Sequence, residues 1–165
     1  MNKKIIGISV LIFVIGIFVW IAKPGLQNNG SPPPVSSNGV LVVEESNVYY
    51  FGTISMAAGK VNHIFKVKNT GSEAVTINKI YTSCMCTTAT LLKGEKSFGP
   101  YGMVGHGFIP RVNQVINPDE EAAVEVVFDP AAHGPAGVGE IERVVTLENN
   151  VGSPIEIFFN ALVTP

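Results

Sequence analysis

Residues Ile5 to Ala22, near the start of the chain, form an uncharged and nearly continuous apolar segment of eighteen positions. At a rise of about 1.5 Å per residue, such a segment would form a helix of about 27 Å, close to the hydrocarbon thickness of a bilayer. A cleavable signal peptide has a shorter apolar region with small residues at the cut site, whereas here Trp20 lies two residues before Ala22. We therefore expect a signal anchor at residues 1–23, with a transmembrane helix at 5–22 that contacts the lipid bilayer.

The lysines around this segment predict its orientation. Lys3 and Lys4 precede it, and only Lys23 follows it before Lys60. Positively charged flanks of a membrane helix stay in the cytoplasm. We therefore expect a single-pass protein of the cell membrane, with a cytoplasmic N-terminus and an extracytoplasmic C-terminal domain.

Residues 24–39 (PGLQNNGSPPPVSSNG) have too few apolar side chains to form a core and are expected to be a tether. The remaining residues, 40–165, suit one domain with a modest core. The part beyond the lysines at positions 3 and 4 has nine basic and thirteen acidic residues and a net charge of −4. This balance, without a cluster of lysine and arginine, excludes nucleic acid as a partner.

Apolar and polar side chains alternate along three stretches of the domain, as expected for strands with one buried face. The alternating stretches are residues 61–67, 124–128 and 155–163. Further strand-like runs are residues 40–51, 75–81 and 141–147. Turn sequences such as Asn69-Thr70-Gly71 separate these runs, and no stretch after Lys23 has the period of a helix. The pattern predicts an all-β fold, an immunoglobulin-like antiparallel β-sandwich.

Six segments follow one another along the domain in a recognisable order: Tyr50 to Ile54, His63 to Gly71, Val75 to Ile77, Ser83 to Thr87, Ile116 to Asp129 and Gly139 to Asn149. This order of motifs resembles that of an exported bacterial family, the domain of unknown function 1573. The S-C-x-C-T element at Ser83 to Thr87 is the most specific of them. The resemblance implies an immunoglobulin-like sandwich, related in fold to ASPM/SPD/Hydin-type domains, in an exported and often anchored protein without an established activity.

Two features depart from the pattern of this family. Met85 stands where the family usually has glycine, and residues 93–115 are longer than the usual link. Within that link, the glycine-rich residues 98–110 are expected to form an ordered surface loop, as are residues 130–139. Neither segment has the G-x-G-x-x-G order of a phosphate-binding loop.

The motifs of common hydrolases are absent from the sequence. It contains no G-x-S-x-G and no H-E-x-x-H, and most carboxylates lie on the polar faces of strands or in turns. We therefore expect no catalytic residues. The domain is expected to be a non-enzymatic interaction module that binds another protein of the cell envelope.

Cys84 and Cys86 are the only cysteines and flank Met85. In an extended segment both thiols point to one face, with Cα atoms roughly 6.6 Å apart, near the upper limit for a disulfide. The pair is therefore either a disulfide at a bend, two small buried hydrophobic side chains, or the beginning of a soft-metal site. The sequence leaves these alternatives open.

A metal bound to this pair would need further ligands from the two glycine-rich segments. The candidate set is Cys84, Cys86, Met103, His106 and His133. Cu(I) suits such a sulfur-rich set, and Zn(II), which needs both cysteines and two histidines, is the less favoured alternative. No other cofactor is expected. His63 alternates with Phe65 and Val67 on one face, which predicts a hydrogen-bonded core histidine rather than a ligand.

Overall fold

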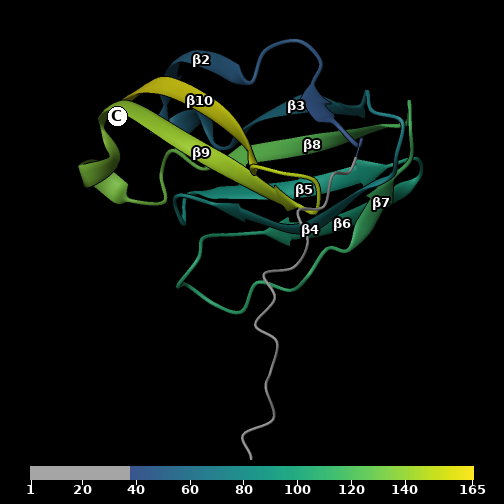
Figure 1. Cartoon of the computed structure of the whole chain (residues 1–165). Coiled ribbons are helices and arrows are strands. Elements are labelled where there is room, and N and C mark those ends of the chain that lie inside the picture. Colours follow the sequence, from purple (N-terminus) through teal and green to yellow (C-terminus); the bar gives the residue numbers. More distant parts are fainter. Residues whose placement is uncertain (1–37) are drawn as a thin grey trace, which may run out of the picture. The chain divides into compact units, whose positions relative to one another are not determined.

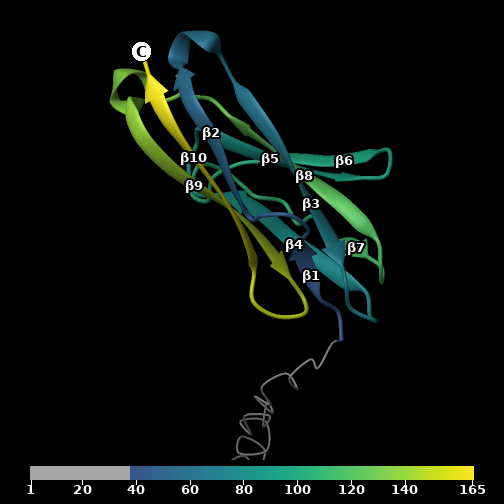
Figure 2. The same cartoon turned by 90° about the horizontal axis from the view of Figure 1, so that it is seen from above.

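A computed structural model describes residues 38–165, which form two five-stranded sheets packed as a β-sandwich (Figures 1 and 2). One sheet has the order β1 (Leu41–Val43), β3 (Val61–Asn69), β8 (Glu121–Phe128), β5 (Thr87–Lys93) and β6 (Lys96–Tyr101). The other has the order β2 (Val48–Ser55), β10 (Ile155–Thr164), β9 (Gly139–Asn149), β4 (Val75–Thr82) and β7 (Gln114–Ile116). Neighbouring strands are antiparallel except β2 and β10, which are parallel. The all-β sandwich predicted from the sequence is confirmed.

The expected anchor at residues 5–22 and the tether up to residue 37 lie outside the described residues. Two 3-10 helices, η1 (Met56–Ala58) and η2 (Gly134–Gly137), are the helices of residues 38–165. Neither has the length and apolar character that a membrane-spanning helix requires.

The core lies between the two sheets and is built by the alternation seen in the sequence. In β8, Val124, Val126 and Phe128 are buried, and in β10 the side chain of Phe159 is fully enclosed. The ring of Phe128 lies 5.5 Å from that of Phe159, so the two sheets meet at this aromatic contact. The inward-facing side chains predicted for residues 61–67, 124–128 and 155–163 are therefore confirmed.

The glycine-rich segment at residues 98–110 is only partly a loop. Its first four residues belong to β6, which pairs with the edge of β5, and the loop itself comprises residues 102–113 before β7. The open edge of β5 offers unpaired backbone N–H and C=O groups to an extended segment beside it. The β6 segment can therefore pair there although it contains Gly99 and Pro100. The loop of residues 129–138 joins β8 to β9 and contains η2.

The chain passes from one sheet to the other between β4 and β5, at residues 83–86. Ser83 fastens this corner to β9, because its backbone N–H donates to Val144 O and its Oγ accepts from Val144 N, both at 2.9 Å. The hydroxyl of Thr82 lies 2.9 Å from Cys84 O and 3.1 Å from Thr87 O. The two cysteines therefore lie in a turn that is fixed at both ends.

Candidate functional site

Cys84 and Cys86 form a disulfide within the turn between β4 and β5. Their Cα atoms are 5.2 Å apart, closer than an extended segment would place them, because the turn bends the backbone. The N–H of Thr87 donates to Cys84 O at 3.1 Å and closes this turn. Cys84 is 7% exposed and Cys86 is 3% exposed. The bend that the sequence requires for a disulfide is therefore present.

His133 comes from the β8–β9 loop and lies against one of the two sulfurs. Its Nε2 is 3.1 Å from Cys84 Sγ, while the histidine itself is exposed to solvent. The ligand atoms of Cys84, Cys86 and His133 all lie within 4.8 Å of one another. Within residues 38–165, this is the one such cluster of three or more histidine, cysteine or acidic side chains.

Backbone contacts hold the β8–β9 loop over the cysteine turn. The N–H of Asp129 donates to Cys86 O at 2.8 Å, which joins the end of β8 to the turn. Asp129 Oδ1 then accepts from the N–H of Ala131 at 3.0 Å, and Gly134 follows His133 with a φ of 56°. Glycine adopts this left-handed conformation without strain, so the chain can reverse immediately after the histidine. In Figures 1 and 2 the loop lies at the same end of the sandwich as the C-terminus.

Arg143 of β9 lies against the other sulfur. Its Nε–H donates to Cys86 Sγ at 3.3 Å, and its NH1 donates to Glu142 O at 2.7 Å. The arginine alternates with the buried Val145 and Leu147, so it occupies an inward-facing position and is half-buried. No carboxylate of residues 38–165 forms an ion pair with it. The sulfur of Cys86 is therefore the main side-chain partner of a half-buried cation.

The structure brings together three of the five predicted ligands. Met103 and His106 instead line a neighbouring hollow of about 350 Å³, whose wall also includes Met85 and Thr87. Met103 forms a bridge with Thr82, and His106 does not join the cluster at the two cysteines. Met103 and His106 thus lie beside Met85 and outside the cluster of the two cysteines and His133.

His63 is a packing residue. Its ring stacks on Tyr49, with centroids 3.5 Å apart and an interplanar angle of 11°. Burial lowers the pKa of His63, while the nearby charge of Glu45 opposes this shift in part. The inward position expected from the alternation is confirmed. The expected hydrogen bond is not found among residues 38–165, and the half-buried ring instead packs on Tyr49 and edge-on against Phe65.

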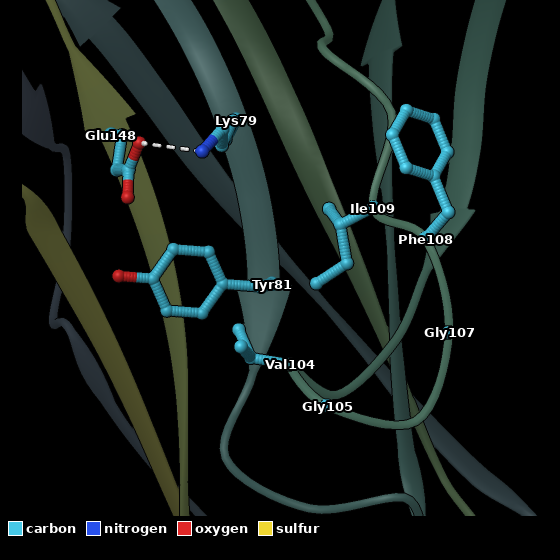
Figure 3. Close-up of a pocket in the computed structure, with 8 residues that line it drawn as sticks. All are labelled: Lys79, Tyr81, Val104, Gly105, Gly107, Phe108, Ile109 and Glu148. Carbon is cyan, nitrogen blue, oxygen red and sulfur yellow. Dashed lines mark ion pairs between the residues drawn. The ribbon is translucent and has the colours of Figure 1, made fainter.

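A second hollow lies beside the loop of residues 102–113. This cleft of about 550 Å³ is lined by the apolar side chains of Tyr81, Val104 and Ile109, with the Lys79–Glu148 ion pair at 3.9 Å on its rim. Figure 3 shows Val104 near the ring of Tyr81 and Ile109 on the other side of the strand that carries Tyr81, while the ring of Phe108 points away from it. Phe108 is 91% exposed.

A comparison with models of protein families identifies the family of the chain. Residues 42–163 match the model of a family described as a protein of unknown function, DUF1573. The chain belongs to this family. The matched residues include the cysteine turn, His133 and Arg143. A comparison with curated proteins finds no match.

Solved structures share the fold of the domain. A protein of unknown function from Porphyromonas gingivalis W83 has a TM-score of 0.57 and 14% identity, over 81% of this chain and 51% of that chain. A family 123 glycoside hydrolase from Clostridium perfringens has a TM-score of 0.53 and 6% identity, over 78% of this chain and 27% of that chain. At these identities the likeness concerns the fold alone. The chain spans about half the length of the Porphyromonas protein.

Proposed function

We propose that the chain is a membrane-anchored, extracytoplasmic domain of immunoglobulin-like type that works by binding rather than by catalysis. Its proposed ligand is Cu(I), held by Cys84, Cys86 and His133 when the two cysteines are reduced. The observation that carries this proposal is the placement of a histidine and an arginine against the two sulfurs, at 3.1 Å and 3.3 Å.

The charge of Arg143 supports a ligand that makes the site anionic. A half-buried cation is costly unless an opposite charge lies beside it, and a neutral disulfide provides none. Two thiolates with Cu(I) carry a net charge of −1. The guanidinium of Arg143, 3.3 Å from Cys86 Sγ, would balance that charge.

The donor set favours Cu(I) over Zn(II). Thiolates are soft ligands that select Cu(I), and an imidazole nitrogen suits copper as well. A structural Zn(II) site needs four protein ligands, whereas Cu(I) accepts two or three. Among residues 38–165, the cluster contains Cys84, Cys86 and His133 and no fourth cysteine, histidine or carboxylate.

Anaerobic titration of the reduced full chain with Cu(I), in detergent and against a competing chelator, tests this proposal. We expect one copper per chain, no binding after Cys84→Ser or Cys86→Ser, and weakened binding after His133→Ala. His106→Ala is the matched control and should bind as the wild type does. The proposal is wrong if the wild type and the double Cys→Ser variant retain copper equally, or if neither retains any.

A second candidate function is supported by the exposed apolar loop of residues 102–113. Phe108 and Val104 are 91% and 55% exposed and lie beside the cleft at Tyr81. Exposed apolar side chains of this size are typical of a contact surface. We propose that this loop docks on another protein of the cell envelope.

Site-specific photo-crosslinking in intact membranes tests this second proposal. A crosslinking side chain at Phe108 should give a discrete adduct, and the same side chain at Val138, which is 45% exposed in the other loop, should give none. Equal crosslinking from both positions, or none from either, would contradict a docking role of the loop.

A further inference from the structure

The geometry points to Cys84 and Cys86 as a reversible redox couple that exchanges two electrons with a dithiol of a partner molecule. A thiolate of the partner attacks the sulfur of Cys84 rather than that of Cys86. This activity goes beyond metal binding and needs no copper. It follows from the unequal surroundings of the two sulfurs.

The first difference is in charge. Cys86 Sγ accepts a hydrogen bond from Arg143, which is always protonated in proteins, and lies 3.6 Å from the hydroxyl of Thr87. Cys84 Sγ lies near the N–H of Cys86 at 3.2 Å and near His133 Nε2 at 3.1 Å, and neither is a permanent cation. In thiol–disulfide exchange, the sulfur that is better stabilised as a thiolate leaves faster. Cys86 is therefore the leaving group.

The second difference is in access. Cys84 is 7% exposed and Cys86 is 3% exposed, and the exposed ring of His133 lies beside the former. An incoming thiolate thus reaches Cys84 from the exposed side of the turn, where His133 lies.

The exchange balances in two steps. In the first, the partner thiol loses its proton to solvent, its sulfur bonds to Cys84 Sγ, the S–S bond breaks, and Cys86 leaves as a thiolate beside Arg143. In the second, the partner's other thiol loses its proton to solvent and its sulfur attacks the partner sulfur of the mixed disulfide, so that the bond to Cys84 breaks and Cys84 leaves and takes a proton from solvent. The partner dithiol is oxidised to a disulfide, and this pair is reduced.

A purely structural disulfide explains these surroundings less well. The cysteines are separated by only two positions, so their bond closes a very small loop and restrains little of the unfolded chain. A half-buried arginine beside a neutral disulfide also lacks a negatively charged partner. Reduction of the disulfide would supply that partner as the thiolate of Cys86.

Trapping the mixed disulfide tests the direction of attack. The oxidised full chain, in detergent with a metal chelator, is exposed to reduced glutathione and quenched with iodoacetamide, and fragment ions on either side of Met85 then assign the two modifications. We expect glutathione on Cys84 and the carbamidomethyl group on Cys86. Glutathione mainly on Cys86, or no reaction of the folded protein, would overturn the inference.

The equilibrium with dithiothreitol in the same buffer tests the role of Arg143. We expect Arg143→Met to shift the equilibrium toward the disulfide by about tenfold, or about 30 mV for a two-electron couple, and Arg143→Lys to restore part of this. Arg111→Met, at an exposed arginine, should behave as the wild type does. Unchanged equilibrium in folded Arg143→Met would overturn the role of this residue. Because the chelator removes copper, this result is independent of the copper titration, which uses chemically reduced protein.

Discussion

At the scale of single residues, Asn69 at the end of β3 bonds through one buried amide to β7 and to the residue just before β1. Its side chain is fully buried, and its Oδ1 accepts from Val40 N and Gly71 N at 3.2 and 3.0 Å. Its Nδ2 donates to Glu73 O and Ile116 O at 2.8 and 2.9 Å. All four hydrogen-bonding positions of the amide are thus satisfied, as a buried polar group requires.

We therefore expect Asn69→Ala to lower the free energy of unfolding by at least about 2 kcal/mol, because four backbone groups lose their partner. Asn62→Ala is the control, since this exposed amide bonds only to Glu125 Oε1 at 3.0 Å. Chemical denaturation of both variants measures the difference. Equal losses would mean that the buried amide does not hold β1, β3 and β7 together.

His63 gives a prediction on pH dependence. Burial lowers the pKa of His63 in the folded protein, whereas in the unfolded chain the imidazole titrates near about 6.5. As the pH falls through that value, the unfolded state binds the proton first, so the free energy of unfolding decreases until the lower, folded pKa is passed. His63→Phe, which keeps an aromatic ring on Tyr49, should reduce this loss of stability between about pH 7.5 and about pH 5.5, which lie about one unit either side of the unfolded pKa.

Denaturation curves of the wild type and of His63→Phe at the two pH values measure this effect. If His63→Phe and the wild type lose the same stability on acidification, His63 is not the group responsible.

At the scale of elements, β8 is a central strand of its sheet, with β3 on one side and β5 on the other. Phe128 at its end is 2% exposed and contacts Phe159 of the opposite sheet. We expect Phe128→Ala to cost about 3–5 kcal/mol of folding free energy, because it removes a large buried side chain. Glu125→Ala, on the outer face of the same strand, should cost little. Thermal or denaturant unfolding compares the two, and similar losses would contradict the register of β8.

The strands that the sequence predicted best are those with one buried face. Alternation located β3, β8 and β10, because each presents apolar side chains to the core at every second position. It did not locate β6, whose Gly99 and Pro100 are typical of loops, since pairing with β5 overrides local preference there. The order of strands, and the parallel pairing of β2 with β10, depend on contacts distant in sequence that periodicity does not contain.

The candidate site shows the same limit. The sequence selects the cysteine pair and His133, but Met103 and His106 line a separate hollow, because the loop of residues 102–113 borders Met85 and does not join the cluster of the two cysteines and His133. Arg143 was missed. Its signal was a charged residue on the inward face of a strand between Ile141 and Val145, and strand alternation alone could have singled it out.

At the scale of the whole molecule, the proposed anchor at residues 5–22 leads to a prediction on topology. Protease added to intact cells should cut within the tether at residues 24–39 and release the domain, because the chain beyond Lys23 is expected to face outward. Immunoblotting with an antibody to the domain measures this release. A protein that is shed without protease, with a new N-terminus near Lys23, would contradict an uncleaved anchor.

X-ray absorption at the copper edge of the reduced, Cu(I)-loaded full chain tests the central proposal most directly, because it reports the atoms bound to the metal. We predict sulfur ligands from Cys84 and Cys86 with one nitrogen ligand that is lost in His133→Ala and retained in His106→Ala and Met103→Leu. A spectrum that stays the same when both cysteines are replaced by serine would contradict the account.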